Sequence, residues 1–169
     1  MPRGKLWLMT RAMGMEGSEA LLQRCLVGRV GTVGSDGMPY VIPMNYVYES
    51  QTRRIYFHHS PSGEGHFLTN LRDNDQVCFE VDEPGPLVAT GDHACNTAQV
   101  YRSVICFGRM STIEDVSEKK RVLDLLVQKY IDRHMPGRMY SPELVQLDQT
   151  LVLAMDIQMM TGKHRQSPK

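Results

Sequence analysis

Two stretches of alternating side chains joined by a four-residue turn place the strongest constraint on the fold of this 169-residue chain. The first stretch is Val27–Val33, and the chain returns over Tyr40–Tyr48. The turn between them, Gly34–Gly37, ends in an Asp-Gly pair, and these residue types tolerate the positive φ angles of tight hairpin turns. The pattern predicts a β-hairpin. Because Pro43 lacks an N–H, it should lie at a bulge, an edge or a break in the ladder.

Further segments continue this pattern and are predicted to be strands: 54–59, 76–81, 99–113 with a bend at Gly108, 150–157, and a short edge piece at 87–90. Helical periodicity predicts three helices, over 16–25, 64–72 and 115–133. Ser18 is the expected cap of the first helix, and Asp115 with Glu118 has the spacing of a capping box. Strands in hairpin order with few helices predict a mainly β fold, a partly open antiparallel barrel with peripheral helices.

No repeat or linker divides the chain, so we expect one domain over residues 1–169, with an N-terminal extension at 1–14 and a basic tail at 164–169 that frays. Nineteen basic and nineteen acidic residues give a net charge of zero, which argues against nucleic acid or an anionic membrane as the main partner. No apolar run approaches the ~18 residues of a membrane span. Four scattered cysteines without a CxxC pair predict reduced thiols in a cytoplasmic protein.

Residues 57–66, Phe-His-His-Ser-Pro-Ser-Gly-Glu-Gly-His, form the segment richest in candidate binding groups. They are expected to run from a strand through a loop to the start of a helix, where unpaired N–H groups suit a phosphate. Ser60 and Ser62 add hydroxyl donors, and the glycines at 63 and 65 allow close approach of the backbone. The alternative is a structural turn in which Ser62 is the helix N-cap.

Other chemistries find less support in the sequence. Adjacent strand residues point to opposite faces, so His58 and His59 should not share a metal ion, and no metal site is predicted. Ser103 and Cys95 lack the surroundings of a catalytic nucleophile.

A series of short motifs runs along the chain in a consistent order: Cys25–Val33, Gly37–Tyr46, Ile55–Ser60, Gly65–Arg72, Val77–Glu80, Tyr101–Ile105 with Gly108-Arg109, and Thr161–Lys163. With these motifs the sequence resembles the pyridoxamine 5′-phosphate oxidase-related flavoproteins, in particular their nitroimidazole-resistance (Nim-type) branch, over roughly residues 20–163. That family has an FMN-binding split barrel.

The resemblance implies a homodimer with an FMN in each groove between the two barrels. It implies that the flavin ring is bordered by Pro43, Met44 and Asn45, largely through backbone groups. It implies that the ribityl and phosphate end is lined by His58, His59 and Ser60, next to the phosphate cradle predicted above from Ser62, Gly65 and His66. It also implies that the groove is approached by Tyr101, Arg102, Ser103 and Lys163.

For function, the resemblance implies an FMN-dependent oxidoreductase that reduces small-molecule acceptors of the nitroaromatic or quinone-like class. His59 is the candidate proton donor, although a phosphate or backbone contact is an equal alternative for it. The alternative function is a non-enzymatic flavin- or haem-binding protein for storage, sensing or electron transfer.

One departure from the family pattern stands out. The family usually has a lysine after Gly-His, and this chain has Phe67. A missing cation is expected to weaken phosphate binding unless His66, Arg72 or Lys163 compensates, or unless haem or another flavin is the ligand. On this interpretation, the substitution Phe67→Lys should raise FMN affinity.

Overall fold

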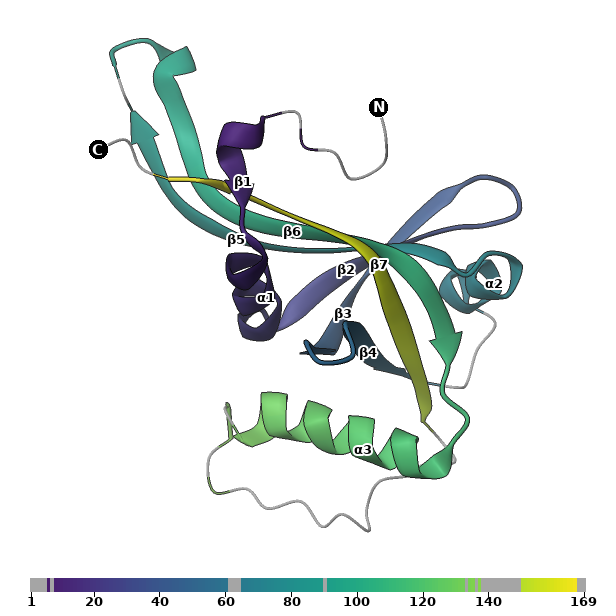
Figure 1. Cartoon of the computed structure of the whole chain (residues 1–169). Coiled ribbons are helices and arrows are strands. Elements are labelled where there is room, and N and C mark those ends of the chain that lie inside the picture. Colours follow the sequence, from purple (N-terminus) through teal and green to yellow (C-terminus); the bar gives the residue numbers. More distant parts are fainter. Residues whose placement is uncertain are drawn as a thin grey trace.

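The computed structural model describes residues 6, 8–60, 65–89, 91–132, 134–135, 137 and 150–166. Within this part of the chain, seven strands form one antiparallel sheet in the order β1-β7-β4-β3-β2-β5-β6, and β6 also pairs with β7. The sheet therefore closes on itself, with β1 added outside the ring as a third neighbour of β7, beside β4 and β6 (Figure 1). The predicted mainly β barrel with peripheral helices is confirmed.

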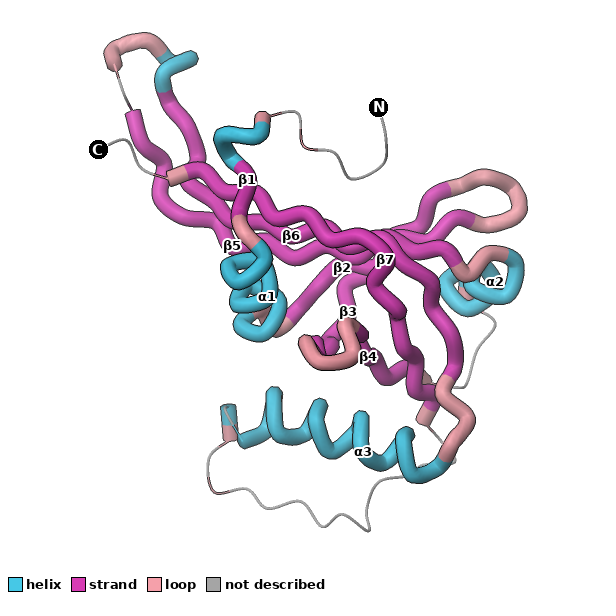
Figure 2. The backbone as a smooth tube through the Cα atoms, viewed as in Figure 1, coloured by secondary structure: helices cyan, strands magenta, loops and turns pink. Residues whose placement is uncertain are grey.

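The strands are β1 (Ala12–Met13), β2 (Val27–Val33), β3 (Pro39–Glu49), β4 (Arg54–His59), β5 (Gln76–Ala89), β6 (Thr97–Thr112) and β7 (Leu151–Arg165). The α-helices are α1 (Met15–Arg24), α2 (His66–Asp73) and α3 (Val116–Val127), which continues into a π-helical turn, η3 (Gln128–Asp132). Short 3-10 turns are η1 (Met9–Arg11) and η2 (Ala94–Asn96). Figure 2 shows the α-helices set around the strands. None of the described helices is long and apolar enough to cross a membrane.

The predicted hairpin is formed by β2 and β3, which pair from Val27 opposite Asn45 to Val33 opposite Pro39. Its turn contains Gly37 at a φ of 78°. Pairing of β3 with β4 begins only at Tyr46, opposite Phe57, so the first half of β3 has a strand neighbour on one side alone. Pro43 lies in this half, as an edge position requires.

The long strands β5 and β7 differ from their predictions. The sequence Asp82-Glu-Pro-Gly was expected to end a strand, yet β5 continues to Ala89 with a register shift between Pro84 and Leu87. The prolines are tolerated because β5 pairs with β2 only at Cys78–Glu80, which leaves its later edge without a second strand. β7 likewise continues to Arg165, where the tail was expected to fray. Residues 82–89, 97–103 and 161–165 thus form an extension, here called the arm (Figure 1).

The barrel interior is filled by side chains that alternate along every strand of the ring. The ring of Phe79 is fully buried and lies edge-on to Tyr46 at 4.8 Å and to Phe57 at 5.6 Å between ring centroids. Gly28 on the neighbouring strand leaves room for it, since a Cβ there would lie 2.1 Å from the Phe79 ring. These contacts fix the barrel that carries the candidate site.

Helix α1 closes one end of the barrel through Leu21 and Leu22, both fully buried. The hydroxyl of Tyr46 donates a 2.6 Å hydrogen bond to the Leu22 carbonyl. Ser18 was predicted to cap this helix, but the helix begins after Gly14 and Ser18 lies buried inside it. Its hydroxyl donates to the Gly14 carbonyl at 2.9 Å, as serines inside helices often do.

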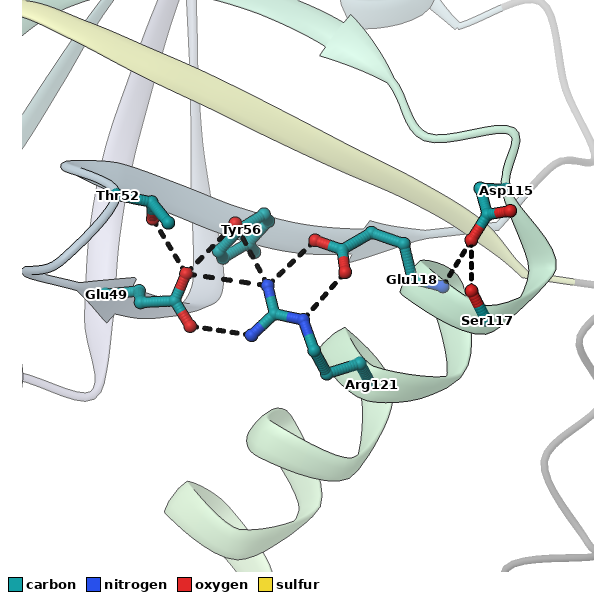
Figure 3. Close-up of polar contacts among 7 residues, drawn as sticks. All are labelled: Glu49, Thr52, Tyr56, Asp115, Ser117, Glu118 and Arg121. Atoms are coloured by element: carbon teal, nitrogen blue, oxygen red, sulfur yellow. Dashed lines mark hydrogen bonds and ion pairs between the residues drawn. The ribbon is translucent and has the colours of Figure 1, made fainter.

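Helix α3 packs on the outside of β4 and β7, where Val122 and Leu126 contact a second apolar cluster around Tyr56. The predicted cap is confirmed, because the Asp115 carboxylate accepts the Glu118 N–H at 2.8 Å. Arg121 ties the helix to the β3–β4 hairpin by donating to Glu49 at 2.6 Å, and within α3 it also donates to Glu118 at 2.7 Å (Figure 3).

Candidate functional site

Six residues predicted to contact the cofactor line a single open groove at the place where β3 and β4 separate. The groove has a volume of about 340 Å³. Its lining is Ile42, Pro43, Met44, Asn45, His58, His59 and Ser60. The groove exists because the β3–β4 ladder starts only at Tyr46, which leaves the preceding strand segment free on that side.

Main-chain groups of this free segment face the groove. The Tyr46 N–H and C=O are directed toward β2, where the Tyr130 hydroxyl lies 2.8 Å from each of them. Because main-chain groups alternate in direction along a strand, those of Asn45 and the carbonyl of Pro43 point away from β2, toward the groove. The nitrogen of Pro43 also points away from β2, so its missing N–H removes no hydrogen bond between β2 and β3. The groove offers backbone donors and acceptors on one wall.

The histidines occupy the opposite wall on β4. His58 is exposed, and desolvation by its surroundings followed by the nearby His59 lowers its pKa below the ordinary value. The ring of His59 stacks on Phe67 with 5.6 Å between centroids. Its Nδ1 lies 2.6 Å from the Ser60 carbonyl, so Nδ1 carries a proton and donates it there. The Nε2 atom of His59 is consequently the one left to accept a proton or, when protonated, to donate one.

The side chain of Phe67 lies in the barrel core. It is 3% exposed and supports the ring of His59 from behind. A lysine at this position would have to bury its ammonium or displace the core. The burial of Phe67 argues against the gain of affinity expected from Phe67→Lys, and that expectation stays untested.

The rest of the predicted phosphate cradle is only partly described. The N-cap of α2 is Gly65, and Ser62, the predicted site residue and alternative cap, lies outside the described residues. His66 begins α2, is exposed, and lies 5.7 Å from the ring of Tyr40.

The four remaining predicted residues lie on the arm. Ser103 pairs with Lys163 across β6 and β7, and the Lys163 ammonium lies 5.9 Å from the centroid of the Tyr101 ring. Arg102 donates to Glu83 at 3.1 Å, and the same carboxylate binds the Arg24 guanidinium at 2.9 Å. Tyr101 and Arg102 line a hollow of about 420 Å³ that shares no lining residue with the groove. A single chain thus does not bring the arm residues to the groove (Figure 1).

The groove residues and the arm residues nevertheless both lie on the exterior of the barrel. Direct cross-strand partners share a face of the sheet, and one such row crosses five strands through Pro43, Arg29, Glu80, Ile105 and Thr161. Two residues farther along β6 and β7, the same face carries Ser103 and Lys163 of the arm. The groove and the arm cluster are therefore parts of one continuous outer surface.

The neighbouring row of this surface is apolar. It consists of Val41, Gly31, Cys78, Phe107 and Met159, each the direct partner of the next. The row borders a shallow hollow of about 390 Å³, and Val41 and Met159 are 59% and 38% exposed. An apolar stripe across five strands is typical of a protein contact surface.

Tyr130 is a groove neighbour that the sequence analysis did not assign to the site. Its helical spacing placed it on an apolar helix face, whereas its hydroxyl contacts the main chain of Tyr46, beside Asn45. The two residues are 84 positions apart, and no local pattern reports such a contact.

Comparison with known proteins is consistent with this architecture. A family model described as pyridoxamine 5′-phosphate oxidase matches residues 16–164. A 5a,11a-dehydrotetracycline/5a,11a-dehydrooxytetracycline reductase from Streptomyces rimosus is 26% identical over 94 residues, which are 56% of this chain and 60% of the reductase. The match therefore spans less than two thirds of that relative.

Two solved structures are similar over most of their length. A candidate 5-nitroimidazole antibiotic resistance protein from Bacteroides thetaiotaomicron has a TM-score of 0.73 and 27% identity, covering 91% of this chain and 86% of that one. A flavocytochrome from Azotobacter vinelandii has a TM-score of 0.72 and 26% identity, covering 92% of this chain and 69% of that one.

Proposed function

Since this chain belongs to the pyridoxamine 5′-phosphate oxidase family, with a split-barrel fold shared with flavoproteins, we propose that it binds FMN in the β3–β4 groove and passes electrons to a small-molecule acceptor. The observation that carries the proposal is the groove itself, in which residues of two strands that the resemblance implied as cofactor contacts meet.

The groups that line the groove fit a flavin. Asn45 would contact the polar edge of the ring through main-chain N–H and C=O groups, with the Pro43 carbonyl as a further acceptor. His58 and Ser60, on the facing wall, would hold the ribityl and phosphate end. When bound, the flavin supplies hydride or single-electron transfer, and the protein supplies orientation and protons.

His59 is the candidate proton donor of this site. Its Nδ1 is committed to the Ser60 carbonyl, and Phe67 fixes the plane of its ring. Nε2 is therefore the ring atom that would accept a proton or, in the imidazolium form, donate one as a general acid. The nitroaromatic or quinone-like class of acceptor is proposed because relatives are a candidate nitroimidazole resistance protein and a reductase.

We further propose that the working unit is a homodimer in which the arm of one protomer completes the groove of the other. Three features support this arrangement: the arm residues do not reach the groove of their own chain, both clusters share one outer face, and an apolar row lies beside them. Pairing of two such faces would cover the apolar row and bring Tyr101 and Lys163 toward a partner's groove.

A second candidate is a flavin- or haem-binding protein that carries electrons without turnover. It is supported by the 26% identical flavocytochrome and by the absence of lysine and arginine from the lining of the groove among the described residues. A histidine at the groove could ligate a haem iron.

Purification separates these candidates. The proposed function expects a yellow protein with about one FMN per chain, whose flavin is reduced by NADH or NADPH and reoxidised by nitroaromatic or quinone acceptors. A bound cofactor without turnover against such acceptors would favour the second candidate. Colourless protein that fails to bind added FMN would overturn the flavin assignment.

Subunit complementation tests the shared site. A groove variant (His58→Ala with His59→Ala) and an arm variant (Tyr101→Ala with Lys163→Ala) should each lose most flavin binding. Refolding them together in equal amounts should restore about a quarter of the sites, because half of the random dimers carry one intact pair of halves. No recovery on mixing would place both halves within one chain or outside the site.

A further inference from the structure

The hydroxyl of Tyr130 lies between two strands of the barrel, although Tyr130 itself belongs to the π-helical turn η3 that follows α3. The Tyr46 N–H donates to this hydroxyl at 2.8 Å. The hydroxyl in turn donates to the Leu26 carbonyl, with the Tyr46 carbonyl 2.8 Å away. Burial raises the pKa of Tyr130 to about 12, so the hydroxyl keeps the proton that these bonds require. Turns of π-helix are frequent at functional sites.

These contacts occupy a missing rung of the β2–β3 ladder. The last paired residues are Val27 and Asn45, so the next rung would join Leu26 and Tyr46 directly. The Tyr130 hydroxyl stands in that position and bonds both strands. The strands can therefore separate there without leaving main-chain groups unsatisfied.

The side chain of Tyr46 makes further contacts that hold this residue in place. Its own hydroxyl donates to the Leu22 carbonyl at 2.6 Å, its ring contacts Phe79, and the Lys129 ammonium lies 3.8 Å from its ring centroid. The residue before it is Asn45, which lines the groove. The direction of the Asn45 main-chain groups follows from the direction of those at Tyr46, because neighbouring residues of a strand alternate.

We propose that Tyr130 is a positioning residue for the cofactor groove: its hydroxyl ends the β2–β3 ladder at Asn45 and fixes the Asn45 N–H and C=O toward the ligand. The inference rests on the proposed flavin site. On this proposal, η3, a turn on the outside of the barrel, helps to orient the flavin through Tyr130.

The test compares two variants of the same helical segment. Tyr130→Phe removes the hydroxyl alone, whereas Leu126→Ala removes buried apolar contacts of α3 and leaves the hydroxyl in place. Both should lower the melting temperature. Only Tyr130→Phe should weaken FMN affinity, by about three- to tenfold, and shift the visible absorbance bands of the bound flavin at saturating FMN.

Equal FMN affinity and an unchanged flavin spectrum in Tyr130→Phe would overturn the inference, as would an equal loss of affinity in Leu126→Ala. If wild-type protein binds no flavin, the proposed function fails instead, so the two failures are distinct.

If Tyr130→Phe does not fold, the exchange rate of the Tyr46 amide in the wild-type protein tests the same inference. Saturation with FMN should slow exchange of the Tyr46 amide by about the same three- to tenfold, because ligand binding and the Tyr130 bond stabilise each other. Protection confined to other groove residues, with the Tyr46 amide unchanged, would contradict the inference.

Discussion

The groove and the arm were predicted to serve the same cofactor, yet they are built in different ways. The groove is continuous with the core: His58 directly follows the buried Phe57, and the ring of His59 stacks on the buried Phe67. The arm residues lie on an extension whose charges are held by exposed pairs such as Arg102 with Glu83. The groove therefore inherits its geometry from the folding of the barrel, whereas the arm has little core to define it.

Because of this contrast, the groove and the arm should respond separately to mutation. Changes to core residues beneath the groove should alter the free energy of unfolding and FMN affinity together, because the same core contacts support both. Changes on the arm should alter binding alone, because exposed pairs contribute little to the free energy of unfolding.

Phe67→Lys should reduce both stability and FMN binding more than any other change considered. Because Phe67 is 3% exposed within the core, an ammonium there should lower the free energy of unfolding by about 3 kcal/mol or more. FMN affinity should fall with it, as His59 loses its support. Chemical denaturation and flavin titration provide the measurements, with Phe67→Leu as a control that costs about 1 kcal/mol. A stable Phe67→Lys protein with tighter FMN binding would show that the groove is independent of the core.

On the arm, Tyr101→Ala should weaken FMN binding by about tenfold and leave the unfolding curve unchanged. Leu87→Ala is the matched control, since Leu87 is 69% exposed on the same extension and lies outside the predicted site. Isothermal titration and denaturation separate the two quantities. A loss of stability in Tyr101→Ala comparable to that in Phe67→Leu would remove the distinction between the halves.

Arg121→Met probes the brace between α3 and the β3–β4 hairpin (Figure 3). For Glu118, hydrogen bonds from Arg121 lower the pKa; for Glu49, desolvation opposes ionisation, but hydrogen bonds from Arg121 and Thr52 outweigh it and lower the pKa too. Both carboxylates have an ordinary pKa of 4.5, and their lowered values mean that the ionic contribution is complete above that pH and is lost as the pH falls through the folded-state values.

The variant should therefore be about 1 kcal/mol less stable than wild type at pH 7, a modest figure because the Arg121 side chain is 40% exposed. The gap should narrow in denaturation curves recorded below about pH 4. A gap that persists unchanged in acid would assign the effect to packing of the arginine stem.

The smallest expected effect concerns pH and the phosphate end of the groove. Desolvation lowers the pKa of His58 and favours its neutral form, whereas a bound phosphate dianion would favour its imidazolium. The ratio of FMN affinity to riboflavin affinity should rise by about threefold between pH 8 and pH 6.5 and fall again below about pH 6, where the phosphate takes up its own second proton. His58→Gln should flatten the rise, whereas His93→Gln, an exposed histidine preceding β6, should not.

Much of the barrel could be predicted because its signals are local. The Asp-Gly turn and the alternation of Val27–Val33 identify a hairpin without any distant information, and the groove then follows from where its second strand loses a partner. Pro84 led to the wrong end for β5 because sequence signals are local. A proline typically ends a strand, and the sequence does not show that this part of β5 has no second strand neighbour that would need the missing N–H.

The unpredicted parts of the site depend on tertiary contacts. Phe67 aligned with a family lysine, but only the packing of α2 against the barrel shows that this position faces the core. Tyr130 carried the spacing of an ordinary apolar helix face, and its bonds to Leu26 and Tyr46 cross most of the chain. The dimeric arrangement and the acceptor remain predictions.

The pairing of β7 determines when the barrel can close during synthesis of the chain. It pairs with β4 at one end, with β6 along most of its length, and with β1 at the other end, so it joins segments from the whole chain. During synthesis, β4 and β6 must wait with unfilled edges until residues 151–165 leave the ribosome. Ring closure therefore comes late in folding, and the strand edges of β4 and β6 stay exposed on the nascent chain until residues 151–165 pair with them.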